Sequence, residues 1–171
     1  MPAGPTQRTA SAHPHLIHRI VDWLIDMPER RSAIFSWLPP LFARIVVGWV
    51  FMWSGWTKLH NLYPSDDFPG MIARFREWGI PFPEIMTPFV SGVEFLGGLL
   101  LLLGLFTRLA ATPLVIVMVV AVISAKWDQV DSLETLLGFE ELAYMALFGW
   151  LAVKGPGPVS VDHLLQRRFG R

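Results

Sequence analysis

Ionisable side chains inside apolar stretches are the residues with the most chemical potential in this sequence. Lys58 ends the first such stretch, Glu94 lies within the second, and Glu140 and Glu141 lie near the start of the last. A charge near the middle of a membrane span costs about 2.5 to 3.5 kcal/mol, so each needs a partner or a function. In a water-poor site such groups transfer protons or bind a polar head group. Lys58, Glu94 and one of the two adjacent acids are therefore candidate catalytic residues.

A second set of residues lies around them. Arg44 and Lys126 are candidates for substrate binding, and Trp53 and Trp56 together would line an aromatic quinone pocket. Each has a structural alternative. Glu94 and Lys58 would form a purely structural ion pair, Lys126 would anchor a helix end at the interface, and the tryptophans would belong to an aromatic belt.

The elements that must position these groups are four apolar runs. The composition, with 53% hydrophobic and 16% charged residues, is unlike that of a soluble domain. Each run is near the ~20 residues that cross ~30 Å of hydrocarbon as a helix. None has the period-2 alternation of a membrane barrel. The sequence therefore predicts an all-α membrane protein, a four-transmembrane-helix bundle with spans at residues 41–59, 85–106, 109–127 and 136–153.

Small residues follow the charges along the first two spans. Arg44, Gly48, Gly55 and Lys58 share one helical face, and Gly97, Gly98 and Gly104 share a face with Glu94. Glycines on a membrane helix permit close packing of a neighbouring helix. At about 1.5 Å rise per residue, Glu94 lies on the order of 12 to 14 Å below the outer end of its span, and Lys58 ends the first span on that same side. We expect a hydrogen-bonded contact between them, direct or through water, with the glycine faces giving a ligand access.

Basic residues predict the topology and the flanking segments. Most of the 14 Lys and Arg residues fall on one side, which places both termini in the cytoplasm, and Arg108 is expected to anchor the third span there. We expect a short helix with an apolar face on the outer connection, residues 60–84. The full division is a disordered tail at 1–15, an amphipathic interfacial helix within 16–38, the bundle at 39–162, and a basic cytoplasmic tail at 163–171.

Several chemistries are excluded or disfavoured by composition. The chain contains no cysteine and its net charge is zero, so it performs no thiol–disulfide exchange and lacks the basic footprint of a nucleic-acid binder. A redox role therefore requires a bound cofactor. His13, His15 and His18 have close spacing but no following carboxylate, and we expect no metal site.

Four motifs occur in order along residues 41–162. They are Arg44-Ile-Val-Val-Gly48 to Gly55-Trp-Thr-Lys58, Trp78-Gly-Ile-Pro-Phe-Pro, Glu94-Phe-Leu-Gly-Gly to Gly104-Leu-Phe-Thr-Arg108, and Gly155-Pro-Gly-Pro-Val-Ser-Val-Asp162. Together they resemble the successive motifs of the DoxX family of small bacterial membrane proteins.

The resemblance implies a four-helix membrane bundle and favours Glu140 over Glu141 as the inward acid of the last span. It also implies the membrane subunit of a quinone-linked oxidoreductase in the bacterial inner membrane, with a redox partner subunit. Many members have a histidine shortly after the third span, where this chain has Ala125-Lys-Trp, which argues against a role for imidazole there. The alternative is a non-enzymatic carrier or assembly factor for a lipid or small solute. The sequence leaves open whether the chain forms a homo-oligomer.

Overall fold

The computed structural model describes residues 37–169. The expected tail at 1–15, all but the last two residues of the amphipathic segment at 16–38, and the end of the basic tail lie outside the described residues. Within residues 37–169 all regular elements are helices, and the prediction of an all-α membrane protein is confirmed. In chain order they are α2 (Leu38–His60), α3 (Met71–Glu77), α4 (Pro83–Leu103), α5 (Thr107–Ala121), the π-helix η1 (Val122–Lys126), the 3-10 turn η2 (Trp127–Gln129), α6 (Leu133–Gly138), α7 (Glu140–Lys154) and α8 (Val161–Phe169).

Three helical stretches in the described part are long and apolar enough to cross a membrane: Leu38–His60, Pro83–Leu103 and Thr107–Gln129. They agree with the first three predicted spans. The predicted fourth span differs, because the chain is extended at Phe139 and divides it into α6 and α7. With 15 residues, α7 is about 22 Å long, shorter than a typical hydrocarbon core.

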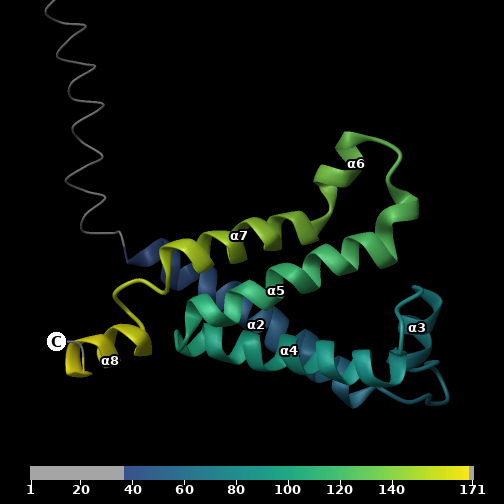
Figure 1. The fold of residues 1–171 in the computed structure, drawn as a ribbon, viewed down its shortest axis with the longest axis horizontal. Helices are drawn as coiled ribbons and strands as arrows, with labels where there is room; N and C mark the ends of the chain where they lie inside the picture. Colours follow the sequence, from purple (N-terminus) through teal and green to yellow (C-terminus); the bar gives the residue numbers. More distant parts are fainter. Residues whose placement is uncertain (1–36, 170–171) are drawn as a thin grey trace, which may run out of the picture. The chain divides into compact units, whose positions relative to one another are not determined.

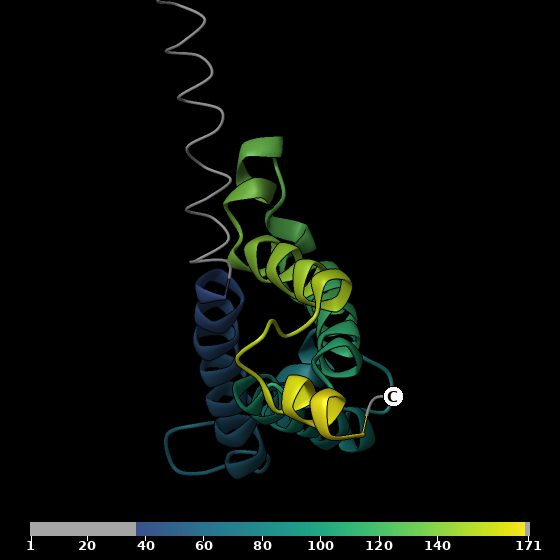
Figure 2. The same cartoon turned by 90° about the vertical axis from the view of Figure 1, so that its left-hand side faces the viewer.

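The helices pack as two pairs, α2 with α4 and α5 with α7. In Figure 1, α4 and α5 diverge from their connection near Gly104, and Figure 2 shows the same helices from the end that carries α8. The two pairs meet in an apolar core around Phe51, Leu114 and Phe148. The ring of Phe51 packs edge-on against Phe148, with centroids 4.7 Å apart. Both pairs therefore surround a common interior.

The two ends of this bundle differ in construction. At one end, called here the lid end, α3 covers the helices with the apolar face predicted for residues 60–84, and Met71 and Phe75 are buried. At the other, called here the clamp end, the loop after α7 and the start of α8 fold back onto the start of α5. Asp162 accepts hydrogen bonds from the backbone amides of Phe106 (2.7 Å) and Thr107 (3.0 Å). A carboxylate at this position satisfies amide donors that a helix start leaves free.

Candidate functional site

Lys58 and Glu94 form an ion pair between α2 and α4. The Lys58 Nζ lies 2.6 Å from each carboxylate oxygen of Glu94, and the Ser54 hydroxyl donates a hydrogen bond to Oε2 at 3.1 Å. The Glu94 side chain is 2% exposed and that of Lys58 is 27% exposed. Lys58 thus connects a buried acid to a more open space. Ser54 was absent from the predicted site, although it precedes Lys58 by one helical turn and so shares its face.

A second ion pair joins the other two helices. Lys126 ends η1 and places its Nζ 2.7 Å from Oε1 of Glu141 on α7. The same ammonium group lies 5.1 Å from the centre of the Phe139 ring, at the break between α6 and α7. A π-helical turn carries one more residue than an α turn, which changes the direction of the side chains that follow it, and such turns are frequent at functional sites. Each helix pair therefore has its own Lys–Glu pair.

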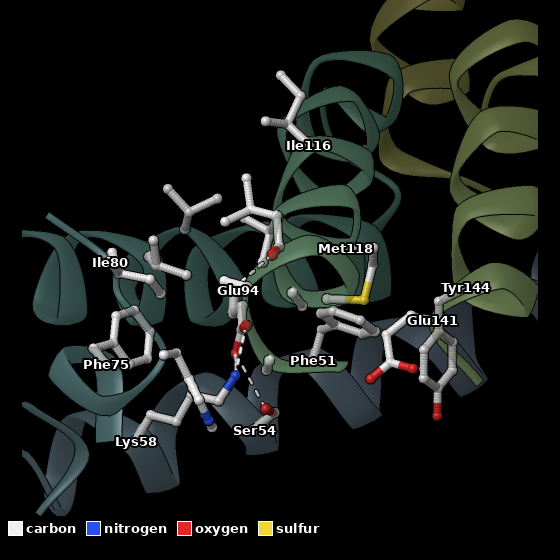
Figure 3. A pocket seen from close by; sticks show the side chains of 18 of the residues that line it. Phe51, Ser54, Lys58, Phe75, Ile80, Glu94, Ile116, Met118, Glu141 and Tyr144 are labelled. Carbon is white, nitrogen blue, oxygen red and sulfur yellow. Dashed lines mark hydrogen bonds and ion pairs between the residues drawn. The ribbon is translucent and has the colours of Figure 1, made fainter. Parts of the chain in front are cut away.

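Both ion pairs line one cavity of about 690 Å³. Figure 3 shows Lys58, Ser54 and Glu94 on one side of it and Glu141 with Tyr144 on another, with Phe51 between them. Phe75 of the lid closes one wall. Most of the remaining lining is apolar. The cavity thus combines two ion pairs and a few other polar side chains with a mostly apolar wall, as small-molecule sites commonly do.

The two adjacent acids at the start of α7 have different partners. Glu140 lines the cavity but is exposed, and its carboxylate accepts a hydrogen bond from the Tyr144 hydroxyl at 3.4 Å. Glu141 is the acid that pairs with Lys126, and its side chain is 12% exposed. This differs from the expected inward orientation of Glu140. Because neighbours on a helix point about 100° apart, the direction of α7 after the Phe139 break decides which acid points inward.

Trp53 and Trp56 lie outside the cavity lining. Their side chains are 56% and 51% exposed on α2. Trp53 stacks on Trp49 with ring centroids 6.3 Å apart, and Trp56 packs against Phe95. The aromatic residues that do line the cavity in the described chain are instead Phe51, Phe75, Trp78, Phe89 and Tyr144. The two tryptophans thus occupy the positions of surface aromatic residues.

The glycines lie at close helix contacts. A Cβ at Gly55 would lie 2.3 Å from the Phe95 amide nitrogen, and one at Gly98 would lie 2.3 Å from that of Met52. Gly48 is similarly covered by Leu102, and Gly97 packs against Leu114 of α5. These faces are closed by backbone and side chains. They do not give the ligand access that the sequence suggested.

Arg44 lies at the clamp end, outside the cavity lining. Its side chain is 1% exposed and donates hydrogen bonds to the carbonyls of Pro40 and Val159, while Nη1 lacks a partner among the described residues. Arg44 therefore ties α2 to the C-terminal loop. Arg108 is exposed at the start of α5, with its guanidinium close to Gly155.

This arrangement defines a small all-α membrane protein with a partly polar cavity inside its helix bundle. The DoxX family profile matches residues 40–127, which hold both lysines and Glu94. The chain belongs to the DoxX family.

Two relatives support this membership. The chain is 37% identical over 135 residues to the uncharacterized membrane protein Rv3486 of Mycobacterium tuberculosis, covering 73% of this chain and 80% of the relative. It is 28% identical over 129 residues to the inner membrane protein YqjF of Escherichia coli, covering 75% of this chain and 93% of the relative. No solved structure matches the chain.

Proposed function

We propose that this protein is the membrane subunit of a quinone-linked oxidoreductase and that its cavity holds the quinone head group. The observation that carries the proposal is the position of Lys58, Ser54 and Glu94 in the wall of a 690 Å³ cavity. This volume lies within the roughly 300 to 1,000 Å³ that is usual for small-molecule sites. A quinone ring is flat and apolar apart from its carbonyl oxygens, and so suits a cavity with few polar groups.

The chemistry of the two ion pairs supports this substrate. A quinone carbonyl accepts hydrogen bonds, and the ammonium groups of Lys58 and Lys126 are donors without acceptor capacity. Reduction of a quinone to a quinol consumes two electrons and two protons. Lys58 is in hydrogen-bond contact with a buried carboxylate, so the pair is able to give a proton to a carbonyl oxygen and take one from the more open side. At the second ion pair, between Lys126 and Glu141, the carboxylates of Glu140 and Glu141 would supply protons in the same way.

The electrons come from a partner in this proposal. The chain contains no cysteine and so carries no thiol donor of its own. A redox subunit that docks at the membrane surface would supply them. The inner bacterial membrane, with both termini in the cytoplasm, is the proposed location. It is supported by the distribution of basic residues and by the printed name of the Escherichia coli relative.

Mass spectrometry of the organic extract from protein in native lipid discs tests the proposal. We expect isoprenoid quinone in stoichiometric amount and its loss in Glu94→Gln. Glu84→Gln is the matched control, because Glu84 also forms an ion pair on α4 but has a 61% exposed side chain. Ser54→Ala, which removes one hydrogen bond to Glu94, provides a milder variant if Glu94→Gln does not fold. Quinone at the level of the surrounding membrane in the unmodified protein would contradict the proposal.

A carrier or assembly factor for a lipid or small solute is the second candidate. One observation favours it: the ammonium groups of Lys58 and Lys126 are each already in contact with a carboxylate. Two such ion pairs are sufficient for a site that only binds a ligand, because binding needs no proton transfer. In that case another lipid or solute would be enriched in the extract, and its loss in Glu94→Gln would identify it as cargo.

A further inference from the structure

We infer that the cavity is loaded sideways from the bilayer, through an opening between the lid-end halves of α4 and α5. The occupant is a membrane-dissolved amphiphile whose polar head reaches Lys58 while its hydrocarbon tail remains in the opening. The identity of the head group rests on the proposed function. The route and the requirement for a tail rest on the exposure of the cavity lining.

Three residues of the cavity lining on α4 and α5 are also on the surface. Phe89 of α4 is 62% exposed, and Ile116 and Val120 of α5 are 60% and 44% exposed. A side chain that belongs both to a cavity wall and to the surface marks the rim of an opening. All three are apolar and lie on segments that are able to cross a membrane. The rim therefore faces hydrocarbon.

The packing of α4 and α5 explains why the opening is at the lid end. At the clamp end the two helices are joined by a tight turn at Gly104, and Gly97 allows Leu114 to pack closely. From there the helices diverge (Figure 1). The space between their lid-end halves is bordered by Met86, Val90 and Val93 on α4 and by Val117 and Ala121 on α5.

Two other routes are less open. The α2–α4 contact is closed by its glycines, and α3 covers the lid end with Phe75, which is 4% exposed. Val50 of α2 also lines the cavity and is 36% exposed, so the α2–α7 side is the competing route. A water-soluble solute would have to pass the aromatic lid, whereas a bilayer amphiphile meets an apolar rim at its own depth.

Single cysteines test the route, because the chain has none of its own. Val120→Cys and Val119→Cys are alkylated with a bulky maleimide in detergent and then placed in lipid discs. The two positions are adjacent valines of similar exposure, 44% and 39%, but Val119 lies outside the cavity lining. We expect the label at position 120 to abolish retention of menaquinone and the label at 119 to leave it unchanged. Tailless menadione, which needs no room for a tail, should bind in both. Equal retention in the two proteins, or loss with a label at Val50→Cys instead, would overturn the route.

A second measurement needs no quinone. Discs that contain a phospholipid with a diazirine on its acyl chain are irradiated, and the cross-linked peptides are mapped. We expect cross-links at Val93 and Val117, inside the opening, and their loss when position 120 carries the bulky label. Absence of quinone from the unmodified protein together with these cross-links would defeat the proposed function and leave the route standing. Absence of the cross-links would defeat the route.

Discussion

The guanidinium of Arg44 occupies the space where a side chain on Gly104 would have to be. A Cβ at Gly104 would lie 1.7 Å from Nη1 of Arg44, and Gly104 ends α4 with φ = 65°. Only glycine adopts such a backbone without strain while leaving room for a neighbouring group. The clamp end therefore depends on the absence of a side chain at this position.

Gly104→Ala is expected to destabilise the bundle strongly. Overlap with Arg44 and the left-handed backbone together should lower the free energy of unfolding by about 2 to 4 kcal/mol. Gly92→Ala is the matched control, since a Cβ there would meet nothing within 4 Å in the described part of the chain and alanine favours a helix. Thermal unfolding in lipid discs measures both. Equal midpoints for the two variants would refute the clamp.

The Lys58–Glu94 pair is expected to respond to charge removal in a non-additive way. Lys58→Met leaves Glu94, which is 2% exposed, without its counter-charge and should cost about 2 to 4 kcal/mol. The double variant Lys58→Met/Glu94→Gln should recover most of that stability and still fail to retain quinone. Denaturant unfolding and quinone content, measured on the same samples, separate the two effects. A double variant that kept its quinone would show that the pair is structural.

An exposed ion pair between α3 and α4 gives the control for this cycle. The side chains of Arg76 and Glu84 are 64% and 61% exposed. Arg76→Ala should therefore change stability by less than about 1 kcal/mol.

The π turn at residues 122–126 is expected to set the direction of Lys126. Deletion of Ile123 should convert η1 to an α-helix and rotate Lys126 by about 100°, away from Glu141. Cysteines in place of Lys126 and Glu141 report on this, because a short bifunctional thiol reagent should join them in the full-length chain and fail in the deletion variant. Deletion of Asp66, which lies in the connection before α3, should leave the cross-link intact. A cross-link that survives removal of Ile123 would show that the π turn is not needed.

Asp131, just before α6 and outside the spans, is expected to have a pKa below its ordinary value. The Thr135 hydroxyl donates a hydrogen bond to its carboxylate at 2.5 Å, which lowers the pKa of Asp131 from 3.8. A lowered pKa means that the ionised group stabilises this helix start above the ordinary pKa and that the effect is lost as pH falls through the lowered value. Carboxyl NMR titration should give a lower midpoint in the unmodified chain and in Thr135→Ser than in Thr135→Val. An unchanged midpoint in Thr135→Val would exclude the hydrogen bond as the cause.

The sequence predicts those features that depend on composition and helical spacing. The first three spans follow from the length of apolar runs, and the contact between Lys58 and Glu94 follows from their position toward the same side of the first two spans. Spacing also places Met71 and Phe75 on the buried face of α3.

Other features depend on local backbone changes that periodicity does not reveal. The π turn before Lys126 and the extended residue Phe139 both alter the direction of the following side chains, and for that reason the inward orientation of Glu141 in place of Glu140 was not foreseen. The role of Arg44 at the clamp end depends on a contact with Val159, which is 115 residues away in the chain. The exposure of Trp53 and Trp56 depends on which helices pack against α2. The residue pattern of one helix does not specify which helices pack against it.

The clamp end also has a consequence for the order of biogenesis. Arg44 emerges from the ribosome 115 residues before Val159, its acceptor, and the amides of Phe106 and Thr107 emerge more than 50 residues before Asp162, their partner. Helices α2, α4 and α5 must therefore be inserted while these donors are still without their final acceptors. A nascent chain halted before the loop after α7 would therefore lack the clamp-end hydrogen bonds of Arg44 to Val159 and of Phe106 and Thr107 to Asp162.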